Sequence, residues 1–127
     1  MVYMEKSEKS VQEVVNKIEK IISDYKFGIQ YIHNIQETLK SKGIELKNEC
    51  QVLDICNPNV AREFLTTDMS LSTIMPCKIS VYKDDECETT VAMNSLVQLV
   101  DDINPDVLEI AQETQKTILT IMKEATL

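Results

Sequence analysis

The sequence predicts a single α+β domain, and three features of the chain support this prediction. Apolar residues spaced three and four apart from Val11 to Ile22 are typical of an amphipathic helix. The segment Cys50–Cys56 is apolar on much of both faces, which is typical of a buried strand. A second amphipathic pattern follows Asn104-Pro105. No linker, repeat or low-complexity segment interrupts these patterns, so we expect one domain over residues 1–127.

The composition is that of a soluble globular protein. Of the 127 residues, 43% are apolar and 27% are charged, which is enough apolar material for a core that folds alone. Aromatic residues make up only 5% of the chain, and tryptophan is absent. We therefore expect aliphatic side chains to form the core.

The charge of the chain argues against nucleic-acid and membrane partners. Thirteen Lys and Arg residues stand against twenty-one Asp and Glu residues, giving a net charge of −8. Such a surface repels phosphate backbones and anionic lipids unless a basic stripe overcomes it. The densest basic cluster, Lys40, Lys42 and Lys47, is diluted by Glu45 and Glu49. The sequence therefore predicts neither kind of partner.

The N-terminal residues and the cysteines favour a cytoplasmic location. Residues 1–10 alternate in charge and hold no apolar run of signal-peptide length, and no segment approaches the ~20 apolar residues that span a bilayer. Thiols stay reduced in the cytoplasm. We therefore expect Cys50, Cys56, Cys77 and Cys87 to be free, with a transient redox pair as the alternative.

The first strand and helix are marked by an apolar run and a cap. Val2 to Met4 predicts a brief strand. Ser7 or Ser10 can cap the helix that follows, and Glu13 stands where a capping box with Ser10 requires it. The β-branched residues of the helix stripe favour packing on a sheet. The stripe consists of Val11, Val14, Val15, Ile18, Ile21 and Ile22.

A second strand and a short helix come next. Gly28 marks the break after the first helix, and residues 29–33 alternate, with Ile29, Tyr31 and His33 on one side. Asn34 can cap a helix over residues 35–42, which Gly43 ends in the left-handed conformation.

Asparagine–proline pairs predict two further helix starts. Asn57-Pro58 begins a helix that extends to Leu65, and Asn104-Pro105 begins the last helix. Between them, residues 79–82 and 89–93 predict a hairpin, turned by the acidic residues 84–86. The acidic run lacks the glycine-centred pattern of a calcium loop, so we do not expect calcium there.

Two cysteines are the first candidates for chemistry. Cys56 ends a strand and Cys77 begins a later one, so antiparallel pairing of these strands would bring the two thiols together beside the helix that begins at Pro58. The partial positive charge of that helix end would lower the pKa of Cys56. The pair would then be reactive or bind metal; the alternative is two buried, inert side chains. Their spacing matches no tight zinc pattern.

The remaining candidates do not complete a catalytic set. His33 is the only histidine and therefore the only possible base for a cysteine nucleophile, although its place on a strand favours a structural or exposed role. The order of residues matches no serine–histidine–aspartate triad, and two glycines cannot form a phosphate-binding loop. The six methionines would line a soft ligand pocket, ligate haem or copper, or fill the core.

Two motifs in order carry a family resemblance. Residues 56–61 are Cys-Asn-Pro-Asn-Val-Ala, and residues 75–82 are Met-Pro-Cys-Lys-Ile-Ser-Val-Tyr. The chain resembles the domain of unknown function 302 family, whose members have a Cys-Asn-Pro segment and a later Leu-Pro-Cys segment. The similarity extends over nearly the whole chain through Phe27-Gly28, Thr38-Leu39-Lys40 and Asn104-Pro105. Met75 replaces the usual leucine, and Asn34 stands where we expect aspartate; neither affects the expected fold.

The resemblance implies a fold similar to the TATA-binding-protein group, with one antiparallel sheet, helices on one face and the order strand–helix–several strands–helix. It also implies a homodimer, but no activity. Cys56 and Cys77 are the positions that carry over from the motifs.

We therefore expect a dimeric α+β domain that is not an enzyme and that binds a small ligand or a partner. Its candidate site residues are Cys56, Asn57, Pro58, Cys77 and His33. The alternative is a thiol-based redox, sulfur-transfer, or soft-metal or haem protein that acts through Cys56 and Cys77. No particular cofactor follows from the sequence.

Overall fold

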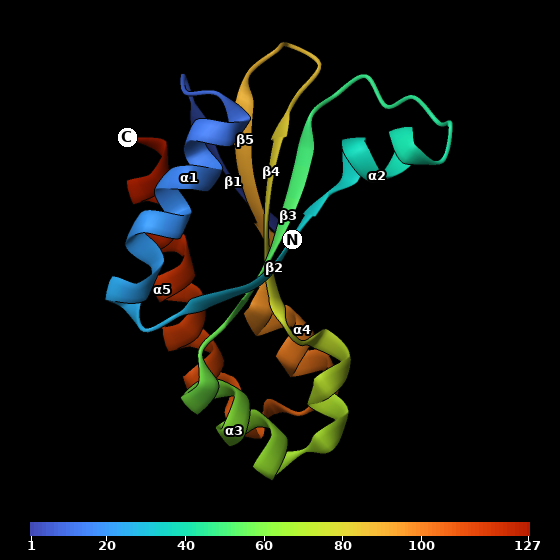
Figure 1. The fold of residues 1–127 in the computed structure, drawn as a ribbon. Coiled ribbons are helices and arrows are strands. Elements are labelled where there is room, and N and C mark those ends of the chain that lie inside the picture. Colours follow the sequence, from blue (N-terminus) through green and yellow to red (C-terminus); the bar gives the residue numbers. More distant parts are fainter.

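A five-stranded antiparallel sheet forms the centre of the protein, with helices beside it and beyond one end (Figure 1). The computed structural model describes residues 1–127. The strands are β1 (Val2–Ser7), β2 (Gly28–Asn34), β3 (Cys50–Cys56), β4 (Cys77–Lys83) and β5 (Thr89–Asn94). The α-helices are α1 (Val11–Ile21), α2 (Ile35–Ser41), α3 (Pro58–Thr67), α4 (Leu96–Ile103) and α5 (Leu108–Thr126), and the 3₁₀ helices are η1 (Ile22–Tyr25), η2 (Met69–Ile74) and η3 (Pro105–Val107).

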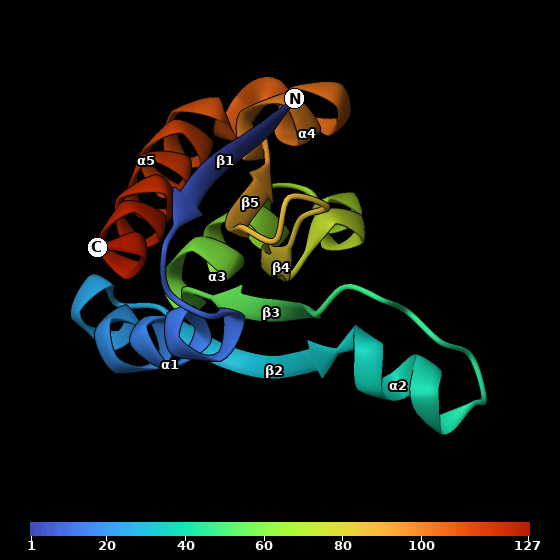
Figure 2. The same ribbon diagram turned by 90° about the horizontal axis from the view of Figure 1, so that it is seen from above.

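The strand order is β1-β5-β4-β3-β2, and every neighbouring pair is antiparallel. Helices α1 and α5 cover the same face of this sheet (Figure 2). These observations confirm the predicted α+β class, with a single antiparallel sheet and helices on one face. None of the helices is long and apolar enough to cross a membrane.

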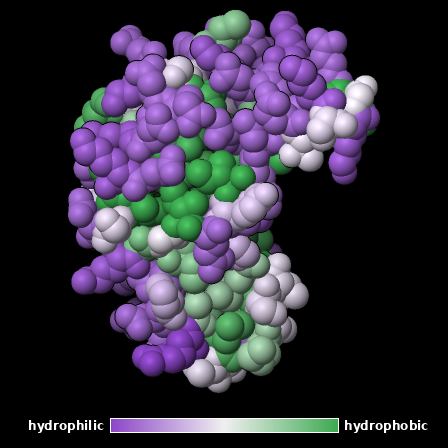
Figure 3. Space-filling model, viewed as in Figure 1, coloured by the Kyte–Doolittle hydropathy of each residue, from purple (hydrophilic) through white to green (hydrophobic).

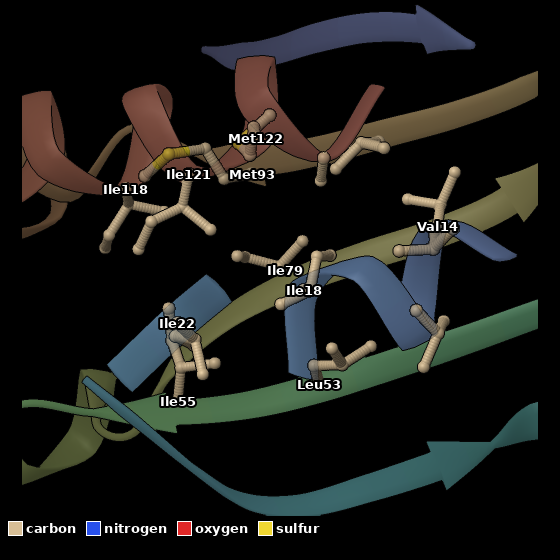
Figure 4. Close-up of a cluster of buried hydrophobic side chains, with 14 of the residues drawn as sticks. Val14, Ile18, Ile22, Leu53, Ile55, Ile79, Met93, Ile118, Ile121 and Met122 are labelled. Atoms are coloured by element: carbon tan, nitrogen blue, oxygen red, sulfur yellow. The ribbon is translucent and has the colours of Figure 1, made fainter. Parts of the chain in front are cut away.

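The main core lies between that face and the two helices. All six residues of the predicted α1 stripe are buried in it, among them Ile18, which contacts no solvent. Figure 4 shows Ile18 beside Ile79 and Leu53 of the sheet, with Ile118, Ile121 and Met122 of α5 facing them. The core is built from aliphatic residues and methionine, with Phe27 as its only buried aromatic side chain.

A second, smaller core lies beyond the end of the sheet. It joins α3, η2, α4, η3 and the first turn of α5 through the buried residues Phe64, Leu71, Leu96, Val100, Val107 and Ala111. Helix α5 therefore belongs to both cores, since Ala111 packs in the second and Ile118 to Ala125 pack in the first.

The opposite side of the sheet, which we call the open face, carries no helix across its middle (Figure 2). Figure 3 shows the molecule hollowed on this side, between the projecting helix α2 and the end formed by α3 and α4. Alternation along the paired strands assigns to the open face Val2, Met4 and Lys6 of β1, Ala92 and Asn94 of β5, Lys78, Ser80 and Tyr82 of β4, Asp54 of β3, and Tyr31 and His33 of β2.

The predicted caps of the first two helices are confirmed, whereas Asn104 caps the 3₁₀ helix η3 and α5 itself begins at Leu108 without a side-chain cap. Ser10 and Glu13 form a capping box, in which the Ser10 hydroxyl accepts from the Glu13 N–H at 3.1 Å. Asn34 caps α2, and Gly43 follows that helix with a φ of 77°. Strand β1 is longer than predicted, because its pairing with β5 continues to Ser7.

A bulge in β2 corrects the predicted alternation. The register shifts between Ile29 and Tyr31, so Ile29 pairs with Ile55, whereas Tyr31 pairs with Asp54. One extra residue moves the following side chains to the other face of a sheet. Ile29 therefore packs on the core, and Tyr31 and His33 lie on the open face.

Helix α4 was absent from the sequence prediction, although its signals are present. Ser95 caps the helix by accepting from the Gln98 N–H at 3.2 Å, and glutamine at that position is part of a capping-box pattern. Leu96 and Val100 are buried at helical spacing. Asp101 and Asp102 belong to the last turn of α4.

Candidate functional site

The turn from β3 into α3 is formed by Cys56, Asn57 and Pro58. The Asn57 side-chain oxygen accepts from the backbone N–H groups of Asn59 and Val60, at 3.0 and 3.3 Å. Pro58 occupies the first helical position, where its missing N–H costs no hydrogen bond. Both residues therefore have the architectural roles predicted for a helix start.

Cys56 and Cys77 lie together at the end of the sheet. Ile55 pairs with Cys77 across β3 and β4, and Cys56 is the next residue along the chain. Both cysteines line one cavity of about 20 Å³, enclosed mainly by apolar side chains. All four cysteines are free thiols, as expected. The predicted juxtaposition of Cys56 and Cys77 is therefore present in the fold.

The two thiols are less acidic than an ordinary cysteine. Burial raises the pKa of Cys56. Burial also raises the pKa of Cys77 to about 11, and the neighbouring charge of Cys56 adds to this effect. The predicted lowering of the Cys56 pKa is therefore wrong. The N–H groups at positions 59 and 60, which would have stabilised a thiolate, already donate to Asn57.

His33 takes part in a polar group on the open face, together with Asp54 and Lys78. His33 Nε2 is 2.7 Å from Asp54 Oδ2, and Lys78 Nζ donates to Asp54 Oδ1 at 2.6 Å. The Tyr31 ring lies against His33, with ring centroids 4.6 Å apart. Sequence reasoning missed Asp54 and Lys78. A charged residue inside an otherwise apolar strand was the available signal for Asp54.

Asp54 remains ionised because of these two partners. It is the only carboxylate among the buried residues, and burial by itself would raise its pKa. The hydrogen bonds from Lys78 and His33 outweigh burial and hold the pKa of Asp54 below its usual value. Asp54 thereby fixes the positions of one cation and one imidazole on the open face.

The structure does not bring His33 to either cysteine of the motifs. His33 pairs with Val52, whereas Cys56 pairs with Gly28, at the other end of the same strands. Four residues of strand separate the two positions on β3, or about 13 Å. A thiol–imidazole dyad is therefore not formed.

A larger pocket of about 300 Å³ opens where β4 begins and β5 ends. It lies between η2 and the first turn of α4, next to the boundary of the two cores. Its six hydrophobic lining residues are Ile74, Met75, Cys77, Met93, Leu96 and Leu99, and Pro76 lies beside them. Its polar lining is Thr73, Lys78 and Asn94. Met75 and Met93 line this pocket, in agreement with the hypothesis that methionines line a ligand pocket. Met69 is exposed.

The pocket and the polar group meet at Lys78. This residue lines the pocket and also binds Asp54. No group of three or more histidine, cysteine, aspartate or glutamate side chains that could hold a metal ion occurs in the structure. The most complete candidate site is therefore an apolar pocket with a positioned lysine at its edge.

Comparison with known proteins places the chain in a family. The family model "Domain of unknown function DUF302" matches residues 3–125, so the chain belongs to the DUF302 family. The crystal structure of an uncharacterized conserved DUF302 protein from Bacillus stearothermophilus superimposes with a TM-score of 0.92 and covers 98% of this chain and 97% of its own. The two sequences are 24% identical, and the likeness shows a shared fold. No curated protein matches the sequence.

The cap at Asn57 predicts a division of roles within the Cys-Asn-Pro turn. Asn57→Ala leaves two N–H groups without their acceptor and should lower the free energy of unfolding by about 0.5–2 kcal/mol. Cys56→Ala removes one sulfur from a small cavity and should cost on the order of 1 kcal/mol. Urea unfolding of both variants measures these changes, with Asn59→Ala, which has no side-chain hydrogen bond, as the matched control. If Asn57→Ala does not change the free energy of unfolding but Cys56→Ala unfolds the protein, the cysteine and not the asparagine stabilises the turn.

The lowered pKa of Asp54 predicts a pH-dependent contribution to stability. The carboxylate is favoured in the folded state, so its contribution is present above its unfolded pKa of about 3.9 and is lost as the pH falls through the lower folded value. Asp54→Asn should lower the free energy of unfolding by about 1–2 kcal/mol at pH 7, and this difference should shrink below about pH 4.

The measurement is urea unfolding of wild type and Asp54→Asn between pH 3 and pH 7. Asp24→Asn, which changes an exposed and unpaired carboxylate, is the control. A difference that stays constant down to pH 3 would contradict the assignment of Asp54 as a stabilising carboxylate.

Proposed function

We propose that this member of the DUF302 family is a non-enzymatic domain that binds a small, largely apolar molecule in the pocket between η2 and α4. The observation that carries the proposal is the pocket itself. Its volume of about 300 Å³ lies at the lower end of the range of small-molecule sites, and six of its ten lining residues are hydrophobic. A few convergent polar groups on an apolar lining are typical of sites that orient a ligand.

The protonation of the thiols supports binding rather than catalysis. A cysteine nucleophile reacts as the thiolate, but burial raises the pKa of both Cys56 and Cys77. The one histidine, a candidate base, is bound to Asp54. A ligand-binding role needs none of these groups to be activated.

We also propose that the protein works as a homodimer that associates through the open face. This face exposes the large apolar side chains of Val2, Met4 and Tyr31. It also carries positive and negative groups, in the ion pairs of Lys6 with Asp84 and of Lys78 with Asp54. A second copy carries the same apolar and charged groups on its open face. A symmetric contact between the two faces can therefore pair opposite charges despite the net charge of −8.

A second candidate function rests on the small cavity shared by Cys56 and Cys77. Met75 lines the same cavity, so two thiols and a thioether meet there. Such ligands suit soft metal ions, and neighbouring thiols suit redox or sulfur transfer. The raised pKa values disfavour this candidate, because both metal binding and exchange require the thiolate.

Filling the pocket should abolish binding of an apolar probe. N-phenyl-1-naphthylamine, a neutral dye, should bind the wild-type protein saturably, with one dye per chain, as measured by fluorescence titration. Thr73→Trp places an indole at the exposed edge of the pocket and should remove this binding. Thr66→Trp, an equivalent change on the exposed surface of α3, should leave it intact. Absence of saturable binding to wild type, or equal loss in both variants, would refute the proposed site.

The dimer should be disrupted by a charge on the open face. Light scattering coupled to gel filtration should give the mass of two chains for the wild type, and of one chain for Tyr31→Glu, because Tyr31 is an exposed apolar residue on that face. Ile44→Glu, at an equally exposed residue after α2, is the control and should remain dimeric. A monomeric wild type at micromolar concentration would refute the dimer.

Alkylation rates should separate the two candidate functions. At pH 8, a thiol with a pKa of about 11 is ionised in about one molecule per thousand, so Cys77 should react with iodoacetamide far more slowly than the exposed Cys87. The Cys77 rate should continue to rise up to about pH 11. Peptide mass spectrometry follows both sites, with urea-denatured protein as the reference. Faster labelling of Cys56 or Cys77 than of Cys87 would favour the thiol-based function.

A further inference from the structure

We infer that the ligand of this pocket is amphipathic and anionic, with an apolar body and a carboxylate or sulfonate at one end that binds Lys78. This inference rests on the proposed function, because it names the chemical class of the molecule in the same pocket. Its basis is the set of polar atoms around the pocket that lack partners within the protein.

The free polar groups of the pocket are hydrogen-bond donors. Lys78 has three N–H groups and uses one for Asp54. The Asn94 side-chain oxygen accepts from the Ser95 N–H at 2.9 Å, which leaves its NH₂ group without a partner. The Thr73 hydroxyl donates its proton to the Ser70 carbonyl at 2.9 Å. A ligand that satisfies Lys78 and Asn94 must therefore present acceptors.

Lys78 and Asn94 both line the pocket, at the ends of β4 and β5 that meet there. The pairing of the two strands ends at Ser80 and Ala92, and Lys78 and Asn94 each lie two residues beyond that pair on the same face. A carboxylate or sulfonate has two or three acceptor oxygens and therefore offers enough acceptors for both side chains.

The carboxylate of Asp54 is not available to bind a cationic ligand. Both of its oxygens are occupied, one by Lys78 and the other by His33, and its side chain is nearly buried. Its role toward the pocket is to position Lys78, since the ion pair at 2.6 Å fixes an otherwise flexible ammonium group. The pocket thus has one positioned cation, one amide donor and no accessible carboxylate among its lining residues.

Two dyes with the same skeleton test this inference. 8-Anilinonaphthalene-1-sulfonate differs from N-phenyl-1-naphthylamine by its sulfonate group, so the ratio of their dissociation constants isolates the contribution of the anion. Lys78→Met keeps much of the length of the side chain and removes the charge. It should weaken sulfonate binding about tenfold, as expected for loss of a charge-assisted hydrogen bond at an exposed site, and change binding of the neutral dye less than about twofold.

Lys83→Met is the matched control. Lys83 lies at the other end of β4, where its ammonium group donates to the Cys87 carbonyl, and its loss should change neither constant. Urea melts of all three proteins confirm that the dyes report on folded chains.

The outcomes separate the inference from the proposed function. If neither dye binds the wild type saturably, both the inference and the proposed function are wrong. If the neutral dye binds and Thr73→Trp blocks it, but the sulfonate dye does not bind, or Lys78→Met affects both dyes equally or neither of them, the pocket stands and the anionic ligand is wrong.

Discussion

The packing of α5 against both hydrophobic cores is the constraint on which the rest of the structure depends. Its C-terminal part, with Ile118, Ile121 and Met122, is buried against the sheet and α1, whereas Ala111 is buried against α3 and α4. The main core can form from α1, α5 and the sheet, but the smaller core has only six buried residues. Since α5 is one continuous helix with a fixed rise per residue, the burial of its residues in both cores fixes the position of the smaller core relative to the sheet.

This double packing explains why the candidate sites lie where they do. The strand ends of β3, β4 and β5 meet η2 and α4 at the junction of the two cores, and side chains there cannot fill the space as regularly as within one layer. The pocket and the small cysteine-lined cavity both occur at this junction. Segment 56–61 and the first residues of segment 75–82, which carry the family resemblance, lie there as well. Asn57 and Pro58 serve the junction by starting α3 at the correct place.

Local signals predicted most of the elements, whereas the polar site depended on long-range pairing. Ser10 with Glu13, Asn34 with Gly43 and Asn57 with Pro58 each fix a helix boundary within a few residues of sequence, so the sequence alone was sufficient there. The group of His33, Asp54 and Lys78 joins three strands, and its geometry requires both the strand order and the bulge after Ile29. No periodicity reveals that bulge, since it moves Tyr31 and His33 to the open face without changing their spacing.

Lys78 links the two surfaces to which we assign a role. It lines the pocket, and it lies with Asp54 and His33 on the open face that we propose for the dimer contact. If the proposed anionic ligand binds, Lys78 shares its N–H groups between the ligand and Asp54, and the charge of Lys78 is then balanced by two anions instead of one. A second copy that covers the open face strengthens the same pair by removing water from it. If both proposals hold, ligand binding and association compete for one side chain, and such coupling acts equally in both directions.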